Sequence, residues 1–402
     1  MKNYSPQKAV DSHSVKIHGW LLPLSWIYHL VVSIRNYLFD SGILKQQAFN
    51  VPIISVGNIT VGGTGKTPHV EYLIRLLHKQ LKVAVLSRGY KRKSKGYLLA
   101  DESSTICDIG DEPLQMFHKF NDIYVAVDRK RVNGIQQLVH NPETKDLDVI
   151  LLDDAYQHRY VKPGINILLI NYHRLISNDA LLPAGRLREP ASEKKRADIV
   201  IITKCPPKLK PMDFRVLTKH LQLMAYQELY FTTLTYGELQ PLFIADLPTK
   251  QLKEIGKNSH LLLLTGIATP KVLENDLQPY CHNIHPLFYP DHHFFTEEDA
   301  QQINQAFAEM PSPKLIVTTE KDATRLHLLN SLSDEVRQHI YTLPVTVKFM
   351  LDQEEQFNKK ILSYLEKNSR NSILVKGKED YKEKPAAPQQ DKKPNTISFI
   401  NN

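Results

Sequence analysis

The most constraining feature of the sequence is a glycine-rich loop between a predicted strand and a predicted helix. It reads Gly-Gly-Thr-Gly-Lys-Thr over residues 62–67, after the apolar run Val51–Val56 and before the helically spaced segment Glu71–Leu81. Glycines let backbone N–H groups approach phosphate oxygens closely, and a helix N-terminus adds a favourable dipole. The context predicts a nucleotide phosphate site, with Lys66 contacting the β- and γ-phosphates and the Thr67 hydroxyl ligating Mg²⁺.

The predicted nucleotide site covers the whole loop. The position five residues before Gly65, which is usually a first glycine, is Thr60 here. The motif identifies a site for nucleotide phosphates, but it does not by itself identify a reaction. The residues expected to bind the nucleotide are Thr60, Val61, Gly62, Gly63, Thr64, Gly65, Lys66 and Thr67.

Short apolar runs alternate with helical segments along the rest of the chain, which favours an α/β fold. We expect a doubly wound, mostly parallel sheet of the P-loop NTPase type, followed by a second, smaller α/β domain. Because 402 residues exceed one ordinary core, two domains are expected. A break rich in Pro, Gly and Asp, 236–248, separates them. The predicted boundaries are 45–235 for the nucleotide-binding domain, 236–367 for the second domain and 368–402 for a disordered polar tail.

A pair of acids follows the apolar run 149–152. Asp153 and Asp154 come directly after Val-Ile-Leu-Leu. P-loop proteins bring a carboxylate to the metal at the end of such a strand. We therefore expect Asp153 or Asp154 to contact Mg²⁺, directly or through water, with Gln157 and His158 facing the same phosphate region. The alternative for His158 is a structural histidine that caps the turn.

The residues from 19 to 44 predict a helix with one narrow polar stripe. Between Leu24 and Phe39 a helix would be about 24 Å long, shorter than a hydrocarbon core of about 30 Å. We therefore expect a membrane-surface helix that lies in or dips into one leaflet. The alternative is a helix packed on the first domain. The polar residues recur every three or four positions, and both tryptophans of the chain lie in the same segment: Ser25, His29, Ser33, Asn36, Asp40, Trp20 and Trp26.

Composition narrows the class of partner. The formal net charge is +8 and the pI is near 9.0, which suggests anionic partners. Binding of nucleic acid rests on this charge alone, so we expect none. Three widely separated cysteines show no metal-ligand spacing, which indicates structural thiols in a reducing compartment.

The spacing of acids and histidines in the sequence does not identify the base that accepts the proton of a substrate hydroxyl. Asp111 lies in Gly-Asp-Glu-Pro, at a predicted helix start where a carboxylate is usually a cap. His292 and His293 follow Asp291 in a loop of the second region. Either set could supply a base near the γ-phosphate. Arginines in the Pro- and Gly-rich turn 182–190 are candidates for clamping phosphate.

Seven ordered motifs resemble the tetraacyldisaccharide 4′-kinases of lipid A biosynthesis, over about residues 19–365. Thr60 matches this family, which tends to lack the first glycine, whereas Ala155 stands where the family often has Gly. The N-terminal segment 21–36 also resembles the family's membrane-associated segment. The seven motifs are SVGNITVGGTGKTP (55–68), LSRGYKR (86–92), GDEP (110–113), LLDDAYQHR (151–159), LLPAGRLREP (181–190), PDHHFF (290–295) and TEKDA (319–323).

The resemblance implies a kinase that moves the γ-phosphate of ATP to the 4′-hydroxyl of a tetraacyldisaccharide 1-phosphate, forming lipid IVA. It implies Mg·ATP, a lipid A disaccharide precursor as partner, and a peripheral or monotopic place at the cytoplasmic face of the bacterial inner membrane. The family's acid–histidine pair corresponds to Asp111 and His292, and Lys321 and Asp322 are implied to lie near the nucleotide.

A different class of protein is the runner-up. The phosphate loop and a surface helix would also suit a membrane-associated P-loop ATPase or GTPase switch that regulates a partner. Against a GTPase, the sequence has no Asn-Lys-x-Asp guanine reader, and Thr-Glu-Lys-Asp at 319–322 matches it only loosely.

Overall fold

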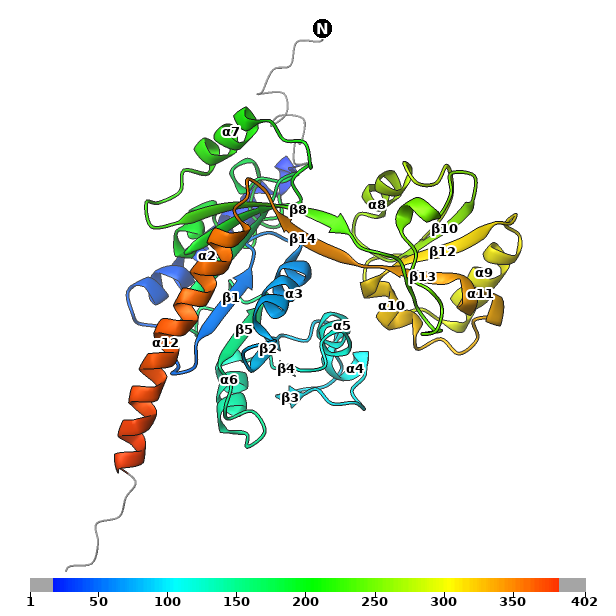
Figure 1. Ribbon diagram of the computed structural model, residues 1–402. Helices are drawn as coiled ribbons and strands as arrows, with labels where there is room; N and C mark the ends of the chain where they lie inside the picture. The colour runs from blue at the N-terminus through cyan, green and yellow to red at the C-terminus, as the bar shows by residue number, and fades with distance from the viewer. Residues whose placement is uncertain (1–16, 383–402) are drawn as a thin grey trace, which may run out of the picture.

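The chain forms two β-sheets, each with its own core. The computed structural model describes residues 17–382, and Figure 1 shows the two sheets side by side, joined by a pair of long strands. Within these residues one sheet has nine strands and the other has five. This confirms the predicted α/β class with a large, mostly parallel sheet.

The nine-stranded sheet carries the glycine-rich loop. Its central strands are parallel, and antiparallel pairs occur at its two ends, where β14 pairs with β8 and β3 pairs with β4. In spatial order its strands are β14 (Val345–Phe349), β8 (Glu228–Tyr236), β7 (Ile199–Thr203), β6 (Ile165–Asn171), β1 (Ile53–Gly57), β5 (Val149–Asp153), β2 (Val83–Ser87), β4 (Tyr124–Val127) and β3 (Leu98–Leu99).

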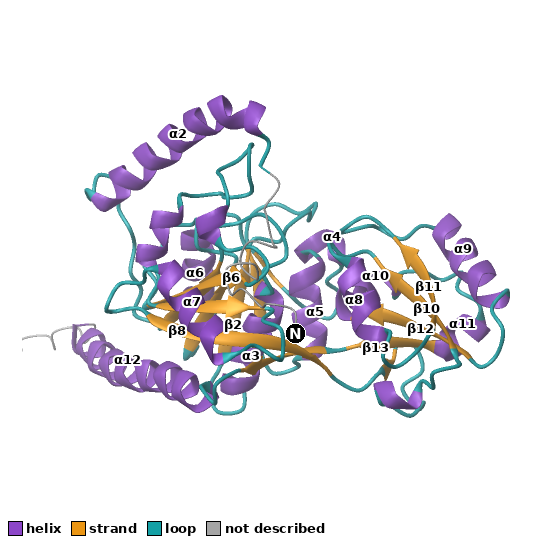
Figure 2. Ribbon diagram, turned by 90° about the horizontal axis from the view of Figure 1, so that it is seen from above, coloured by secondary structure: helices purple, strands orange, loops and turns teal. Residues whose placement is uncertain are grey.

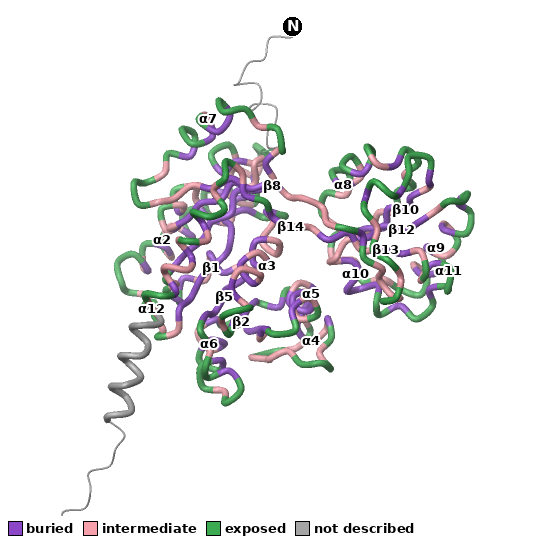
Figure 3. Tube along the Cα trace, in the orientation of Figure 1, coloured by how far each residue is buried: buried purple, intermediate pink, exposed green. Residues whose placement is uncertain are grey.

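Helices cover both faces of this sheet. Every residue of β1, β2, β5 and β7 is buried, as expected for parallel strands enclosed on two sides. Apolar residues of α3, α5 and α12 fill one face, and those of α6 and α7 fill the other. Figure 3 shows the burial concentrated along the strands. The helices are α3 (Lys66–Leu77), α4 (Ile106–Ile109), α5 (Asp111–Lys119), α6 (Arg131–His140), α7 (Pro211–Leu221) and α12 (Glu354–Lys382).

The five-stranded sheet repeats this arrangement on a smaller scale. Leu273 and Leu277 of α8 pack on one face, while Ile303 and Phe307 of α9 pack on the other. Its strands, in spatial order, are β11 (Asn283–Phe288), β10 (His260–Thr265), β12 (Lys314–Thr319), β13 (Ile340–Leu343) and β9 (Gln240–Pro241). Its helices are α8 (Pro270–Leu277), α9 (Glu297–Ala308), α10 (Glu320–Leu326) and α11 (Asp334–His339).

The chain passes between the sheets twice. It leaves the first sheet along β8 and returns along β14, which pairs with β8 from Val345 opposite Tyr236. Phe357 and Ile361 of α12 then lie in the core of the first sheet. The predicted second domain, 236–367, is one continuous stretch of the chain. We propose instead that the first domain comprises 45–236 with 344–368, and the second 237–343.

Helix α2 (Leu22–Asp40) buries part of its polar stripe, with Val32 and Phe39, against the protein and exposes most of its other large apolar residues. Ser25 and Asn36 are buried, whereas Trp26 and Leu30 are 69% and 62% exposed. Figure 2 shows α2 at the outer edge of the part of the protein that contains the nine-stranded sheet. This distribution is the reverse of a helix packed in a core. Within residues 17–382, no helix has both the length and the apolar character needed to cross a bilayer.

Predicted elements agree with the structure where the local pattern is strong. Three of the short apolar runs that alternate with helical segments, Val83–Leu86, Ile165–Ile170 and Ile199–Ile202, lie in β2, β6 and β7. The predicted polar tail begins at 368, but α12 continues to Lys382. The remainder of that tail, 383–402, lies outside the described residues.

Replacing Phe357 with Ala tests the assignment of α12 to the first domain. Phe357 is 1% exposed in the first core, so its loss should lower the free energy of unfolding by about 3–5 kcal/mol. Chemical denaturation monitored by circular dichroism measures the change. Val272→Ala, at a residue 56% exposed on α8, is the control and should change it little. Equal, small effects of the two substitutions would contradict the assignment.

Candidate active site

The glycine-rich loop has the backbone of a phosphate site. It joins β1 to α3, and Gly62 and Gly65 have φ angles of +113° and +82°, which side-chain-bearing residues rarely adopt. Lys66 is the first residue of α3, with its side chain 13% exposed. The backbone N–H groups and the helix N-terminus therefore present positive charge to the space that Lys66 faces.

Side chains from other elements hold the loop in place. Asn58 Nδ2 donates to Thr64 Oγ1 at 2.8 Å, and Thr203 Oγ1 donates to the Thr64 carbonyl at 2.8 Å. His69 Nδ1 lies 2.7 Å from the Gly65 carbonyl, so Nδ1 carries the proton that it donates. Burial lowers the pKa of His69 to about 4, and the ring is therefore neutral near pH 7. These contacts fix the loop before any ligand binds.

A second lysine faces the loop from the end of β7. A Cβ atom added to Gly63 would lie 3.6 Å from Lys204 Nζ. Burial, and after it the charge of Lys66, lowers the pKa of Lys204. Two cationic side chains thus approach one loop, which suits a polyanionic ligand.

The two acids after β5 lie at the loop. Asp154 Oδ1 is 3.6 Å from Lys66 Nζ, and its Oδ2 is 3.3 Å from Arg188 NH1. Asp153 Oδ2 accepts a hydrogen bond from Ser87 Oγ at 3.1 Å. Its other oxygen, Oδ1, is buried and has no hydrogen-bond partner among the described residues. A buried carboxylate oxygen without a donor is suited to a cation.

The electrostatic surroundings shift the pKa values of Asp153 and Asp154 in opposite directions. Burial raises the pKa of Asp153 to about 7, and the nearby carboxylates of Glu112 and Asp154 add to the effect. The pKa of Asp154 is lowered, because Lys66 and Arg188 outweigh its burial. The site around Asp153 is therefore short of positive charge.

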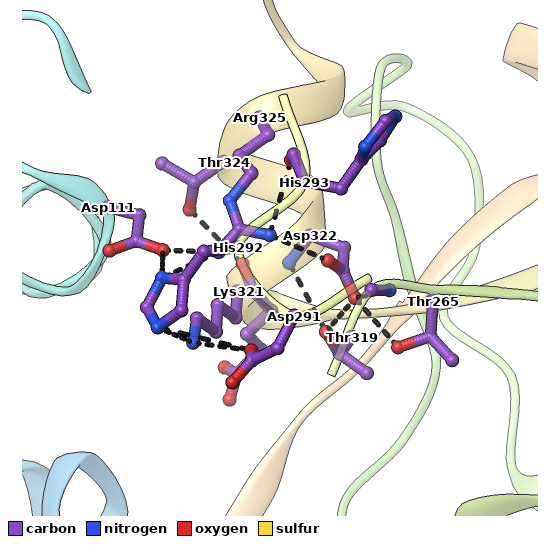
Figure 4. A network of polar contacts seen from close by, with 12 residues as sticks. Asp111, Thr265, Asp291, His292, His293, Thr319, Lys321, Asp322, Thr324 and Arg325 are labelled. Carbon is purple, nitrogen blue, oxygen red and sulfur yellow. Dashed lines mark hydrogen bonds and ion pairs between the residues drawn. The ribbon is translucent and has the colours of Figure 1, made fainter. Parts of the chain in front are cut away.

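Asp111 and His292 are in contact where the two sheets meet. Their spacing in the sequence did not identify either one as the base. Asp111 begins α5 on the first sheet, and His292 lies in the loop between β11 and α9 on the second. His292 Nδ1 is 2.8 Å from Asp111 Oδ2, as Figure 4 shows. The ring of Tyr90 lies edge-on to the imidazole, with centroids 5.3 Å apart. The two side chains are 7% and 17% exposed, so they form a shielded pair that remains open to a ligand.

Two cations of α10 complete this contact. Arg325 forms an ion pair with Asp111, and Lys321 Nζ lies 3.0 Å from His292 Nε2. Burial alone would raise the pKa of Asp111. The hydrogen bond from His292 and the charges of Lys321 and Arg325 instead hold it well below its usual range. Arg325 was not among the predicted site residues. On α10 it lies three residues after Asp322, a spacing that is compatible with an ion pair.

His293 and Asp322, which are next to His292 and Lys321 in the sequence, contact other residues. His293 Nε2 lies 2.7 Å from Asp299 Oδ2, and not at Asp111. Asp322 of α10 is fully buried, and it accepts hydrogen bonds from Thr265 Oγ1 and the Gly266 N–H at the end of β10. Asp322 thus anchors the second domain.

Gln157 connects the acids to the loop, while His158 does not. Gln157 Nε2 donates to the Asn58 carbonyl at 2.7 Å. His158 Nε2 accepts from the Arg131 N–H at 3.4 Å, and burial lowers its pKa to about 4. Gln157 thereby contacts the phosphate loop, and His158 has the structural role of holding a turn.

Glu112 lies between the two halves of the site. It is 3.8 Å from Lys321 Nζ, and it also lies within the electrostatic influence of Lys66 and Asp154. Burial, together with Asp111, raises its pKa. The phosphate loop with its acids and the Asp111–His292 pair therefore form one continuous polar site, with the chemistry expected for phosphoryl transfer to a hydroxyl.

Sequence comparison finds one family and many close relatives. The model of the LpxK family, tetraacyldisaccharide-1-P 4′-kinase, matches residues 17–366. A tetraacyldisaccharide 4′-kinase from Phocaeicola vulgatus is 57% identical over 364 residues, covering 90% of this chain and 99% of the relative. One from Bacteroides thetaiotaomicron is 50% identical over 374 residues, covering 90% and 97%.

A solved structure is also similar. The crystal structure of LpxK from Aquifex aeolicus in complex with ATP has a TM-score of 0.66 and 27% sequence identity, and the match covers 87% of this chain and 99% of that one. The sequence and structural matches thus extend over both sheets.

Replacing Lys66 with Ala tests the phosphate loop. Loss of a cation aimed at the transferring phosphoryl group should lower turnover by about 10²-fold or more, because that charge stabilises the transition state. A kinase assay and circular dichroism on the same sample separate lost chemistry from lost folding. Lys79→Ala, at an exposed lysine beyond the end of α3, is the control. Near-normal turnover of the Lys66 variant would overturn the assignment.

Proposed function

The chain belongs to the tetraacyldisaccharide-1-P 4′-kinase family, and we propose that its phosphoryl transfer takes place where the two sheets meet. The protein is an ATP-dependent kinase that phosphorylates the 4′-hydroxyl of the lipid A disaccharide precursor. The alternative, a nucleotide switch that regulates a partner, is not favoured, because the relatives are kinases along nearly their whole length. The observation that carries the proposal is the contact of Asp111 with His292 beside the phosphate loop.

ATP is the phosphoryl donor, held by residues 60–67. The ATP in the Aquifex aeolicus structure supports this, as do the positive φ angles and fixed carbonyls of the loop. Lys66 contacts the β- and γ-phosphates and neutralises charge that develops during transfer. Because Lys66 already lies near Asp154, it changes partner rather than becoming newly buried when the nucleotide enters.

Mg²⁺ is held by Thr67, Asp153 and Asp154. The buried Asp153 oxygen without a donor supports this, as does the all-oxygen donor set. The described residues contain no group of three or more His, Cys, Asp or Glu side chains that could hold a metal ion. Mg²⁺ usually needs only one or two carboxylates, because phosphates and water supply the rest. When bound, Mg²⁺ neutralises charge on the β- and γ-phosphates.

Asp111 and His292 act as one unit on the acceptor hydroxyl. A positioned acid–base group must lie within hydrogen-bond reach of the proton that it takes, and a partner carboxylate can orient the ring. The pair is built across two sheets, so its geometry depends on their mutual position. Closure of the sheets around the substrates would exclude water and limit wasteful hydrolysis of ATP.

The outward face of α2 lies against the bilayer. Trp26, Leu30 and Ile34 are more than half exposed, and the polar face of the helix is tied to the protein by Ser25 and Arg35. An apolar exposed face on a docked helix is what an interfacial helix requires. The acylated substrate resides in a membrane, so the kinase works at its surface. We place it at the cytoplasmic face of the inner membrane, where ATP is supplied.

Transfer of label tests the reaction and the pair together. With γ-labelled ATP and tetraacyldisaccharide 1-phosphate, the label should appear on the 4′-oxygen of the lipid. Asp111→Ala and His292→Ala should each lower kcat by about 10²- to 10⁴-fold with little change in the KM for ATP. Because the two act as a unit, the double variant should lose little more than either single one.

A matched control is His293→Ala, which removes the adjacent imidazole that contacts Asp299 instead. It should retain most of the activity. Label released only as inorganic phosphate would contradict the kinase reaction. Losses that multiply fully in the double variant would show that Asp111 and His292 work independently.

Polar substitution on α2 tests the membrane contact. Each buried apolar side chain contributes about 1.5 kcal/mol or more, so Trp26→Gln with Leu30→Gln should weaken vesicle binding by about tenfold or more. Deleting α2 would be a poorer test, because Arg35 NH2 donates to the Gln157 carbonyl beside the phosphate loop. Cosedimentation with anionic vesicles measures binding, and ATP affinity checks the fold.

The control for this experiment is Val272→Gln with Leu328→Gln. Both residues are 56% exposed and belong to the second domain. Their replacement should leave vesicle binding unchanged. Equal vesicle binding by both double variants and the unaltered protein would exclude α2 as the contact.

A further inference from the structure

Arg325 joins two buried carboxylates with the two arms of its guanidinium. It lies on α10 of the second domain and is 3% exposed. NH2 forms an ion pair with Asp111 of the first domain, and NH1 lies 3.1 Å from Asp322 Oδ1 of its own helix. Figure 4 shows the guanidinium between these groups, beside the imidazole of His292. The nearest ring atom, Nδ1, is 3.5 Å from NH2.

Asp322 is a fixed anchor for this arginine. Its Oδ2 accepts from the Thr265 hydroxyl at 2.8 Å, from the Gly266 N–H at 3.0 Å and from the Thr319 hydroxyl at 2.7 Å. The carboxylate therefore cannot turn without breaking several buried hydrogen bonds. Arg325 consequently extends from a rigid part of the second domain towards Asp111.

Both oxygens of Asp111 already accept hydrogen bonds. Oδ2 accepts from His292 Nδ1 and from Arg325, and Oδ1 accepts from the Glu112 N–H at 3.0 Å. These donors, with Lys321 nearby, hold the pKa of Asp111 well below its usual range despite burial. A carboxylate bound in this way is a poor acceptor for the proton of a sugar hydroxyl.

The free lone pair of the His292–Asp111 pair lies on the imidazole. An ionised carboxylate only accepts, so the contact with Asp111 requires a proton on His292 Nδ1. Lys321 Nζ, 3.0 Å from Nε2, can only donate, which requires a lone pair there. In this arrangement Nε2 carries the lone pair, and it is the atom that can accept a proton.

We infer that Arg325 is a positioning residue for catalysis: it holds the Asp111 carboxylate in the place from which that carboxylate orients the imidazole of His292. This inference rests on the proposed role of the Asp111–His292 pair. The 4′-hydroxyl proton moves to Nε2 while the hydroxyl oxygen forms a bond to the γ-phosphorus. The bond from that phosphorus to the β–γ bridging oxygen breaks, and its electron pair leaves with ADP.

The substrate hydroxyl displaces the Lys321 ammonium from His292 Nε2. Its ammonium is 3.3 Å from Asp291 Oδ1 and 3.8 Å from Glu112 Oε1, so two carboxylates can hold it when it leaves Nε2. The hydroxyl then occupies the position beside His292 that the ammonium held.

Arginine is required at this position by geometry. Its planar fork reaches Asp111 and Asp322 at once, whereas a lysine ammonium on a flexible chain would serve as a single point charge. A buried ion pair can also serve merely to hold two domains together. The two roles differ in one respect: a positioning residue loses its importance when His292 is absent, and a structural residue does not.

The experiment is a double-variant cycle between Arg325 and His292. Arg325→Met and Arg325→Lys are made in the natural sequence and in His292→Ala, and kcat, the KM for ATP and thermal unfolding are measured with the full-length protein. In the natural sequence, Arg325→Met should lower kcat by about 10²-fold, because misplacing a reacting group has that effect. The KM for ATP should change little, and Arg325→Lys should restore only part of kcat. In His292→Ala, the same substitution should cause little further loss.

The outcomes separate the two proposals. If His292→Ala leaves kcat unchanged, the proposed role of the pair fails. If His292→Ala lowers kcat but the Arg325 losses multiply with it, Arg325 is structural and the inference alone is overturned.

A second measurement needs no Arg325 variant, in case these fail to fold. Nitrogen-15 NMR of the histidine-labelled natural protein, with the His292 signal identified by its absence in His292→Gln, should show the tautomer protonated at Nδ1. A proton on Nε2 in the neutral ring would contradict the inference.

Discussion

The contacts that Asp111 makes with the second domain are the interactions on which this site depends. Each sheet has its own core, and β8 with β14 forms the strand connection between them. The phosphate loop belongs to one sheet and His292 to the other. A hydrogen bond and an ion pair to one carboxylate therefore set where His292 lies relative to the phosphate loop. Small changes in the angle between the sheets would alter this geometry more than any change within either core.

Helix α2 is connected to the candidate active site by hydrogen bonds and ion pairs. The polar residues of α2 face the loops that carry Gln157, Arg188 and Glu189, where Tyr28 donates to the Arg188 carbonyl and Arg35 pairs with Glu189. Arg188 in turn pairs with Asp154. The exposed apolar residues of α2 are thus attached directly to the loop whose Arg188 pairs with Asp154. This arrangement suits a soluble donor and an acylated acceptor that must meet at one place.

The sequence predicts those elements whose pattern lies within a few consecutive residues. The phosphate loop, β5 with its two acids and the two faces of α2 each follow from spacing within a few residues. The return of the chain along β14 did not, because β14 pairs with a strand 109 positions away (Val345 with Tyr236) and carries the polar residues Thr346 and Lys348. Asp111 and His292 were matched by family resemblance and not by spacing. Arg325 lies 214 residues from Asp111, so only the fold shows their contact.

A structure of the protein with a non-hydrolysable ATP analogue, Mg²⁺ and tetraacyldisaccharide 1-phosphate would test the central claim most directly. We expect the 4′-oxygen of the acceptor about 3 Å from His292 Nε2, a hydrogen-bond distance, and in line with the γ-phosphate on the loop. Asp111 should keep its contacts with His292 and Arg325, and Lys321 should have turned towards Asp291. A 4′-oxygen bonded to the Asp111 carboxylate, with His292 remote from the acceptor, would contradict the account.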